Sequence, residues 1–243
     1  MTIWLIGGTS DSAMLSQEMI MSGIPTLVTI TTESAKHLYP DSSLLTIKIG
    51  KPEPSEITAI VDASHPYATK ITKYAIALSH QNNIPYLRYE RPNLEAQTAI
   101  ELDSFETLLE SDYLTGQRVL LTVGYKALPL FQPWQNRATL YTRILPVVNS
   151  LLVATAAGFS SDRIIALRPP INFDLEKALW LQWKISLVIT KASGTKGGED
   201  IKRSVAQELN IPLLVIARPK IFYAKQTSSA REVIAFCHQH LKR

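Results

Sequence analysis

The residues with the clearest chemical potential lie at positions 62–67, where the sequence reads Asp-Ala-Ser-His-Pro-Tyr. They follow a short apolar run, a pattern typical of a polar turn at the end of a buried strand. Pro66 suits the first turn of a helix, because that position needs no backbone N–H. Ligands of open parallel sheets bind beyond the carboxyl ends of the strands, so Asp62, Ser64 and His65 are candidate site residues. The alternative is structural: Asp62 and Ser64 cap the helix, and His65 is a surface turn residue.

A glycine turn near the start of the chain could bind a phosphate. Apolar residues 2–6 lead into this turn, and helical spacing follows up to Gly23. The turn consists of Gly7, Gly8, Thr9, Ser10 and Asp11. Its glycines would let a phosphate approach the backbone, and the helix N-terminus would offer N–H groups and the positive end of its dipole. The full GxGxxG pattern is absent, so a purely steric need for glycine is the alternative.

A third polar turn spans residues 191–200, KASGTKGGED. Its backbone N–H groups, with Lys191 or Lys196, could hold a phosphate or a carboxylate. The residue order differs from GxxxxGK[ST], and a flexible surface loop before a helix capped by Glu199 or Asp200 is the alternative. We find no metal-ligand spacing and no GxSxG elbow, so we expect neither a protein-bound metal nor a serine hydrolase. Dinucleotide chemistry needs only these turns, because the cofactor carries the reaction.

Strand and helix patterns alternate along the chain and predict an α/β fold with parallel sheets. Expected strands cover residues 2–6, 26–31, 44–49, 60–62, 84–89, 118–123, 139–145, 164–167, 186–190 and 213–217. Expected helices cover residues 13–23, 66–82, 105–114, 149–158, 174–183, 201–209 and 229–241. Residues 93–102 resemble a linker, and we place the boundary between two domains there, as 1–98 and 99–243.

The two halves share an internal repeat. Asn83-Ile84-Pro85 and Asn210-Ile211-Pro212 each precede a strand, and in both halves an Arg-Pro pair follows at the same spacing. Each block comes after a strand, a polar turn and a helix. The repeat predicts that the turns at residues 62–66 and 190–194 occupy equivalent places and face a shared cleft.

Composition narrows the class of protein. The 243 residues are 46% hydrophobic, which permits a substantial core, and no apolar run approaches the roughly 18–20 residues of a membrane span. The single cysteine, Cys237, excludes an internal disulfide framework, so we expect a reducing cytoplasm and a buried thiol. A net charge of +4 from scattered basic residues argues against nucleic acid and fits a small polyanionic ligand.

The end of the second strand bears on cofactor choice. An acidic residue there holds an unphosphorylated ribose in many dinucleotide sites. Here Thr31, Thr32 and Lys36 could take a 2′-phosphate, whereas Glu33 could hold a bare ribose. The sequence leaves NADPH and NADH open.

Together these motifs resemble the precorrin-6A reductase and cobalt-precorrin-6A reductase family over nearly the whole chain. The segments that carry the resemblance are Gly7-Gly8-Thr9, Asp62 to Ala68, Ile84-Pro85 to Arg91-Pro92, Thr122-Val123-Gly124 and Thr190 to Gly194. The resemblance implies two Rossmann-like domains facing a shared cleft. It also implies hydride transfer from NADPH or NADH to a double bond of an anionic corrin precursor, a tetrapyrrole.

The resemblance also implies roles for individual residues. The expected cofactor-binding residues are Gly7, Gly8, Thr9, Ser10, Asp11, Thr31, Thr32, Asp62, Ser64, Thr122 and Gly124. The expected substrate-binding residues are Pro66, Tyr67, Lys191, Ser193 and Gly194, and His65 is the candidate catalytic residue because its ordinary pKa lies nearest neutrality. The competing hypothesis is a two-domain nucleotide-sugar transferase or an anion-binding module without redox chemistry. The sequence assigns no oligomeric state.

Overall fold

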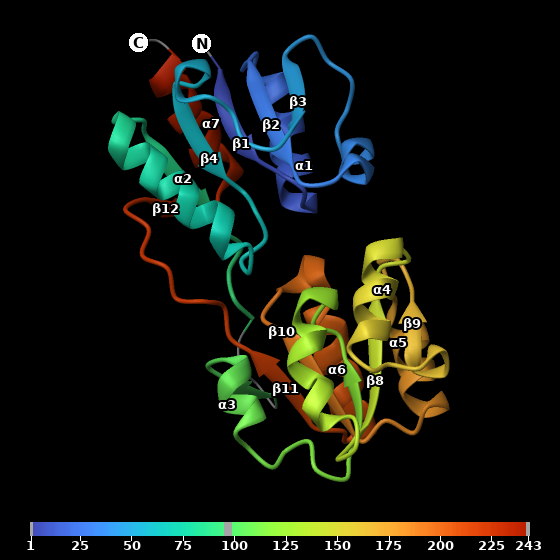
Figure 1. Cartoon of the computed structure of the whole chain (residues 1–243). Coiled ribbons are helices and arrows are strands. Elements are labelled where there is room, and N and C mark those ends of the chain that lie inside the picture. Colours follow the sequence, from blue (N-terminus) through green and yellow to red (C-terminus); the bar gives the residue numbers. More distant parts are fainter. Residues whose placement is uncertain (1, 95–98, 242–243) are drawn as a thin grey trace. The chain divides into compact units, whose positions relative to one another are not determined.

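Six parallel strands form the first sheet, in the order β12-β5-β4-β1-β2-β3 (Figure 1). The computed structural model describes residues 2–94 and 99–241. Of Ser34 it describes the backbone alone. The strands are β1 (Ile3–Ile6), β2 (Thr26–Ile30), β3 (Leu45–Ile49), β4 (Ala59–Asp62), β5 (Tyr86–Tyr89) and β12 (Gln226–Thr227). The helices of this unit are α1 (Ser10–Met21), α2 (Thr69–Asn82) and α7 (Ala230–Leu241).

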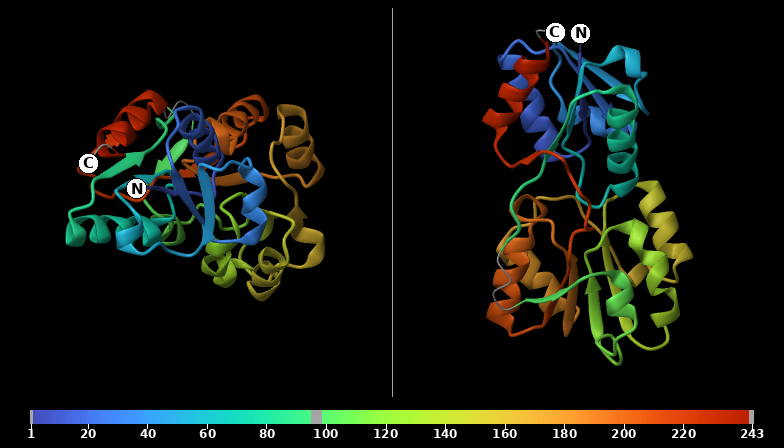
Figure 2. Two further views of the ribbon diagram at one scale, coloured as in Figure 1. Left: turned by 90° about the horizontal axis from the view of Figure 1, so that it is seen from above. Right: turned by 90° about the vertical axis from the view of Figure 1, so that its left-hand side faces the viewer.

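Alternation along β1 builds the two faces of this sheet. Helices α1 and α7 cover one side of the sheet, and α2 covers the other (Figure 2). Ile3 and Leu5 pack in a core cluster with residues of α1 and α7, whereas Trp4 and Ile6 pack in a cluster with residues of α2. All four side chains are buried, as expected for a parallel sheet with helices on both faces. This burial fixes the strand register that brings the polar turns to one edge.

The second sheet also has six parallel strands, in the order β6-β11-β10-β7-β8-β9. Its last five strands repeat the topology of the first sheet, whereas its edge strand β6 opens the unit and the corresponding β12 is the last strand in the chain. Its strands are β6 (Ile100–Leu102), β7 (Arg118–Leu121), β8 (Thr139–Ile144), β9 (Ile164–Ala166), β10 (Leu187–Lys191) and β11 (Leu213–Ile216). Its helices are α3 (Phe105–Leu109), α4 (Val148–Ala156), α5 (Phe173–Gln182) and α6 (Glu199–Leu209). Trp180 of α5 and Val205 of α6 are fully buried in one core cluster against this sheet.

The fold confirms the predicted α/β class with two parallel sheets, and it confirms that the two turns of the internal repeat occupy equivalent places. That these turns face a shared cleft stays a prediction. The units β4–α2–β5 and β10–α6–β11 hold the same places in the two sheets. Both helices end in a left-handed asparagine, Asn83 at φ 53° and Asn210 at φ 52°. Asparagine tolerates this conformation better than most residues, which explains its presence at both C-caps.

The chain divides between the two units differently from the predicted division at residues 98 and 99. The first unit comprises Met1–Pro92 and Pro219–Arg243, and the second comprises Asn93–Arg218. The last segment joins the first unit because β12 pairs with β5 and because α7 buries Val233, Phe236 and Cys237 in that unit's core. The expected linker at residues 93–102 falls partly outside the described residues, at 95–98, and its last three residues form β6.

Several predicted elements have different limits in the structure. The helix expected from Pro66 begins at Thr69, because residues 65–68 form a turn in which His65 O accepts from Ala68 N at 2.7 Å. The helix expected at residues 105–114 ends at Leu109. After β7 the chain forms a 3₁₀ segment, Tyr125–Trp134, which contains Pro129 and Pro133 and so cannot continue as an α-helix.

Candidate functional site

The candidate site of the first unit lies where the strand order of its sheet reverses. From β1 the chain moves to β2 and β3 on one side, and from β4 it moves to β5 on the other. Ile6 and Asp62 are register partners at the ends of β1 and β4, so the following turns are neighbours. Thr9 Oγ1 donates to Ala63 O at 2.9 Å and ties the two turns together. Such a switch point is where open α/β sheets bind ligands.

The glycine turn is built to let another group approach its backbone. A Cβ on Gly7 would overlap the Tyr39 hydroxyl and lie 2.7 Å from Val28 Cγ1, so only glycine fits there. Gly8 has φ +92°, and a Cβ placed on it would meet nothing within 4 Å. The open space at Gly8, at the start of α1, can accommodate a phosphate.

Tyr39 stabilises this turn by hydrogen bonds, and the sequence did not predict this role. Its hydroxyl accepts from Gly8 N at 2.7 Å and lies 2.7 Å from Ser12 Oγ. Burial raises the pKa of Tyr39, so the phenol stays neutral. No motif marks a lone tyrosine in a loop, and only the folded chain brings it to the glycines.

The N-terminus of α1 is capped internally. Thr9 Oγ1 accepts from Ser12 N at 3.0 Å, and Ser12 Oγ accepts from Thr9 N at 3.1 Å. Ser10 is exposed at the first position of the helix. Asp11 is buried in an ion pair with Arg91, with Oδ2 and Nη2 3.2 Å apart. Five predicted cofactor residues, at positions 7–11, thus lie together here, but Asp11 already forms an ion pair within the protein.

Asp62 is the centre of a buried polar network. Its Oδ1 accepts from Arg88 Nη1 at 2.9 Å and from Ser64 N at 3.0 Å, and its Oδ2 accepts from Tyr86 Oη at 2.9 Å. Arg88 is 1% exposed and also donates to Glu90 Oε2 at 2.9 Å. Neither Asp62 nor Ser64 caps α2, whose N-cap Ala68 has no side-chain cap bond, so the capping alternative is wrong.

The role of this network is to hold the turn after β4. Ser64 Oγ accepts from Arg88 Nη1 at 3.2 Å and lies 3.3 Å from Thr72 Oγ1. Burial and the Asp62 carboxylate raise the pKa of Tyr86, which therefore remains a neutral donor. The sequence contains one sign of this network, because Arg88 is a charged residue inside a strand of largely apolar residues. In the structure Asp62 and Arg88 are register partners of β4 and β5.

His65, Pro66 and Tyr67 follow directly on this turn. His65 Nδ1 accepts from Tyr67 N at 3.3 Å, which in the neutral ring leaves the proton on Nε2. The ring centroids of His65 and Tyr67 lie 5.7 Å apart, and Pro66 is buried. The structure therefore brings the predicted catalytic residue to the β1/β4 switch point with its imidazole half-exposed.

Thr31 and Thr32 are exposed immediately after β2, the strand next to β1. Glu33 and Lys36 follow in a 3₁₀ segment, Glu33–Leu38, and form an exposed ion pair with each other. The acidic residue expected to bind a ribose and the lysine expected to bind a 2′-phosphate are therefore partners of one ion pair.

The other predicted site residues belong to the second unit. Lys191 ends β10, and Ser193 and Gly194 follow it, with Gly194 N donating to Glu199 Oε2 at 2.8 Å. Burial, together with the nearby Lys126, lowers the pKa of Lys191 to about 8. Thr122 Oγ1 donates to Ile189 O at 3.1 Å, which makes Thr122 a bridge between β7 and β10.

Glycines shape the loop after β10. Gly194 has φ +68° and Gly198 has φ +67°, and a Cβ on Gly197 would overlap the Ser193 side chain. Gly124, with φ +79°, is the N-cap of the 3₁₀ segment after β7. The carboxyl edge of the second sheet is therefore lined by glycine turns and cations.

Two features are absent from residues 2–94 and 99–241: a membrane-spanning helix and a cluster of metal ligands. No helix there is long and apolar enough to cross a membrane. No group of three or more histidine, cysteine or acidic side chains is placed to hold a metal ion.

The fold defines a two-sheet α/β protein with a glycine turn at the switch point of its first sheet. Residues 2–238 match the family described as Precorrin-6x reductase CbiJ/CobK, and the chain belongs to this family. A cobalt-precorrin-6A reductase of Synechocystis sp. is 46% identical over 99% of this chain and 97% of its own. A second, of Priestia megaterium, is 31% identical over 96% of both chains. The solved structure of CobK precorrin-6A reductase superposes with a TM-score of 0.79 at 18% identity, covering 98% of this chain and 96% of that one.

Proposed function

We propose that this protein reduces cobalt-precorrin-6A, with hydride delivered from NADPH to one double bond of the macrocycle. The observation that carries the proposal is the family match over residues 2–238. The two relatives described above are both named cobalt-precorrin-6A reductases, which supports the cobalt-containing substrate over precorrin-6A. The cobalt belongs to the substrate. The single buried cysteine fits the cytoplasm as its compartment.

The residues of the first switch point fit a dinucleotide. The open space at Gly8 and the start of α1 would hold the pyrophosphate, while Ser10 lies at the first turn of that helix. Thr31 and Thr32 would lie beside the adenosine ribose at the end of β2. Asp62 and Ser64 would act as positioning residues, because their polar atoms already hold the turn.

The bound cofactor supplies the hydride, and the residues of the chain orient the reactants. His65 would direct Nε2–H toward the bound ligands, since its Nδ1 is engaged by Tyr67 N. As the neutral ring it would stabilise the reacting atom by a hydrogen bond from Nε2–H. To deliver the proton that completes the reduction, it would act as the imidazolium and return to the neutral ring. Tyr67 and the buried Pro66 would limit water access beside it.

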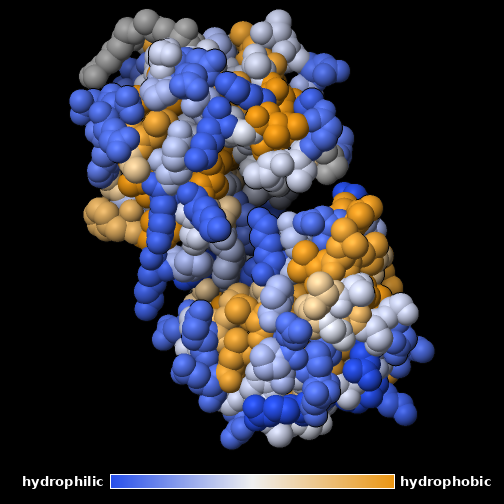
Figure 3. Space-filling view, viewed as in Figure 1, coloured by the Kyte–Doolittle hydropathy of each residue, from blue (hydrophilic) through white to orange (hydrophobic). Residues whose placement is uncertain are grey.

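The second unit would bind acidic arms of the macrocycle. Lys191, Ser193 and Gly194 lie at the carboxyl end of β10, where a cation and glycine turns suit carboxylates. Exposed Leu145 and Val148 follow β8 at the same edge, and apolar side chains gather over α4 (Figure 3). Apolar surface beside cations suits a ring system that carries charged arms.

The first experiment is a fluorescence titration of the purified protein with NADPH and with NADH. We expect saturable binding of NADPH, with Lys36→Gln weakening NADPH but not NADH. Equal affinity for NADPH and NADH would favour Glu33 over Lys36 as the residue that contacts the adenosine ribose. Anaerobic assays with cobalt-precorrin-6A and precorrin-6A, followed by NADPH oxidation and product mass, then test the reaction. If neither is reduced and neither dinucleotide binds, the proposed function is wrong.

His65→Ala tests whether His65 takes part in the reaction. We expect kcat to fall about 10²-fold, the low end of general acid–base contributions, with NADPH affinity and unfolding midpoint nearly unchanged. His65→Gln, which keeps a donor, should recover part of the loss. Wild-type turnover in His65→Ala would remove this residue from the mechanism.

A further inference from the structure

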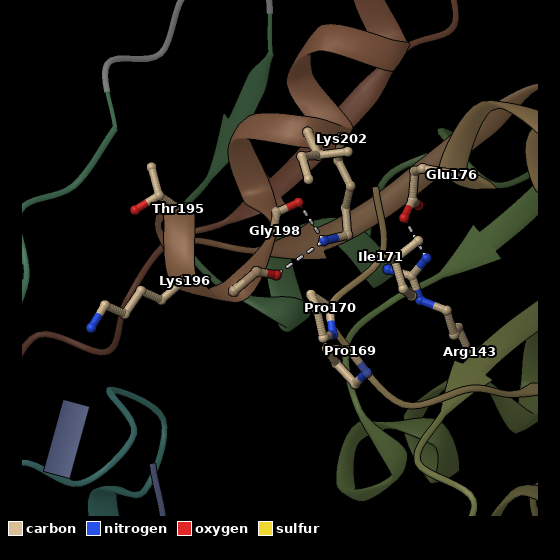
Figure 4. A pocket seen from close by; sticks show the side chains of 11 residues that line it. Arg143, Pro169, Pro170, Ile171, Glu176, Thr195, Lys196, Gly198 and Lys202 are labelled. Atoms are coloured by element: carbon tan, nitrogen blue, oxygen red, sulfur yellow. Dashed lines mark hydrogen bonds and ion pairs between the residues drawn. The ribbon is translucent and has the colours of Figure 1, made fainter. Parts of the chain in front are cut away.

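A pocket of about 130 Å³ lies in the second unit, beside the glycine loop after β10, whose Gly197 and Gly198 are among its lining residues (Figure 4). Arg143 at the end of β8, the Pro169–Pro170 segment after β9 and the start of α6 line it. All three belong to the carboxyl edge of the second sheet, where ligands of such sheets bind. Since roughly 10–15 Å³ suffices for a water molecule, the pocket has room for a carboxylate.

Lys202 is the buried lysine that lines the pocket. It is 3% exposed, and its Nζ donates to Gly197 O at 3.2 Å and Gly198 O at 2.8 Å. These two carbonyls leave the third ammonium hydrogen available and neutralise no charge. Within the described part of the chain, Lys202 forms no ion pair within 4 Å.

Among the described residues, no neighbouring carboxylate contacts Lys202 directly. Arg143 pairs with Glu176, which also accepts from Trp180 Nε1 at 2.9 Å. Glu199 pairs with Arg203 at 2.7 Å between Oε1 and Nη2. Asp200 of α6 acts on Lys202 only through space, from beyond ion-pair distance. Because a buried ammonium group without a carboxylate in contact is costly, Lys202 beside a pocket favours an anionic ligand there.

We infer that this pocket binds a carboxylate of the substrate, with Lys202 as its principal contact and Arg143 beside it. The inference rests on the proposed function for the identity of the substrate, whose acetate and propionate arms supply such groups. The start of α6 adds the positive end of a helix dipole on the same side. Lys191 and Lys202 would then receive different arms of one macrocycle.

The test uses uroporphyrin, a stable tetrapyrrole with acetate and propionate arms, and its uncharged methyl ester. Binding to the full-length protein is measured by calorimetry and by quenching of tryptophan fluorescence. We expect Lys202→Met to weaken uroporphyrin binding about tenfold, the loss of one charge-assisted contact. The ester should bind weakly to both proteins. Lys177→Met, which removes an exposed charge of α5 outside the pocket, is the matched control and should change affinity less than twofold.

Further measurements separate the alternatives. If Lys202→Met weakens NADPH and leaves uroporphyrin unchanged, the pocket binds a cofactor phosphate and the inference is wrong. It is also wrong if neither affinity changes. Should Lys202→Met fail to fold, Thr195→Asp against Thr195→Asn places a negative charge on an exposed lining residue and should weaken uroporphyrin alone. Unchanged binding in Thr195→Asp would then overturn the inference. Because uroporphyrin binding requires no turnover, a failed reductase assay does not decide the result.

Discussion

Gly7 and Gly8 are adjacent but are required for different reasons. We expect Gly7→Ala to destabilise the protein by about 1–3 kcal/mol, because its Cβ overlaps Tyr39 and Val28 in a packed core. Gly8→Ala meets no neighbour, so backbone strain alone should cost about 1–3 kcal/mol, while its methyl group occupies the space for a phosphate. Urea unfolding and NADPH titration measure the two effects.

Gly116→Ala is the control for strain, since Gly116 has φ +73° and open space but belongs to the second unit. It should match Gly8→Ala in stability and retain NADPH affinity. Equal NADPH affinities of Gly8→Ala and Gly116→Ala would exclude the glycine turn from cofactor binding.

Asp62 tests whether a predicted ligand contact is instead a structural one. Asp62→Ala leaves Arg88, 1% exposed, without one of its two carboxylate partners, and should destabilise the protein by about 3–5 kcal/mol. Asp62→Asn keeps an acceptor for Ser64 N and should cost less. A double-mutant cycle with Arg88→Met in urea unfolding gives the coupling energy of the pair. If Asp62→Asn abolishes NADPH binding without losing stability, Asp62 contacts the cofactor directly.

At the scale of elements, the start of α6 makes stability depend on pH. Burial lowers the pKa of Lys202 to about 8 from an ordinary value of 10.5. Arg143 of β8 also lowers it, while Glu176 of α5 and Glu199 and Asp200 of α6 oppose the shift. Above pH 8 the folded state loses this proton and the unfolded state keeps it, so stability should rise with pH between about 8 and 10.5.

Lys202→Met should remove this rise, measured as the difference in urea midpoint between variant and wild type at pH 7.5 and pH 10. The comparison is needed because Lys191 also has a lowered pKa of about 8 and contributes a parallel rise to both proteins. Uroporphyrin affinity should fall over the same range in wild type. A pH dependence identical in both proteins would show that Lys202 is charged throughout.

The sequence predicted the strand–turn–helix units well because each is a local pattern. The strands before Gly7 and Asp62 and the repeated asparagine ends of α2 and α6 all follow from residues close together in the chain. The contacts of Tyr39 with Gly8 and Ser12 do not, since contacts over long separations depend on how the folded elements pack. β12 was missed because two residues carry no periodicity, and it forms only as an added edge to β5.

At the scale of the molecule, the chain leaves the first unit after residue 92 and returns at residue 219. The returning segment supplies β12 and α7, whose buried Val233, Phe236 and Cys237 complete the core against α1. Burying three such side chains contributes roughly 5–9 kcal/mol, comparable to the whole stability of a typical domain. The first unit therefore depends on the far end of the chain, whereas the second is continuous.

This dependence predicts how fragments behave. Residues 93–218 should fold cooperatively and retain uroporphyrin binding sensitive to Lys202→Met, whereas residues 1–98 should not fold. Residues 1–92 joined to 219–243 by a Gly-Ser linker should fold and bind NADPH. Cys237, the sole cysteine, reports docking of α7, because its thiol is fully buried and burial raises its pKa to about 12. A thiol reagent should therefore react slowly with the joined fragment and rapidly once urea unfolds it. Cooperative unfolding of residues 1–98 alone would show that α7 is dispensable to the first unit.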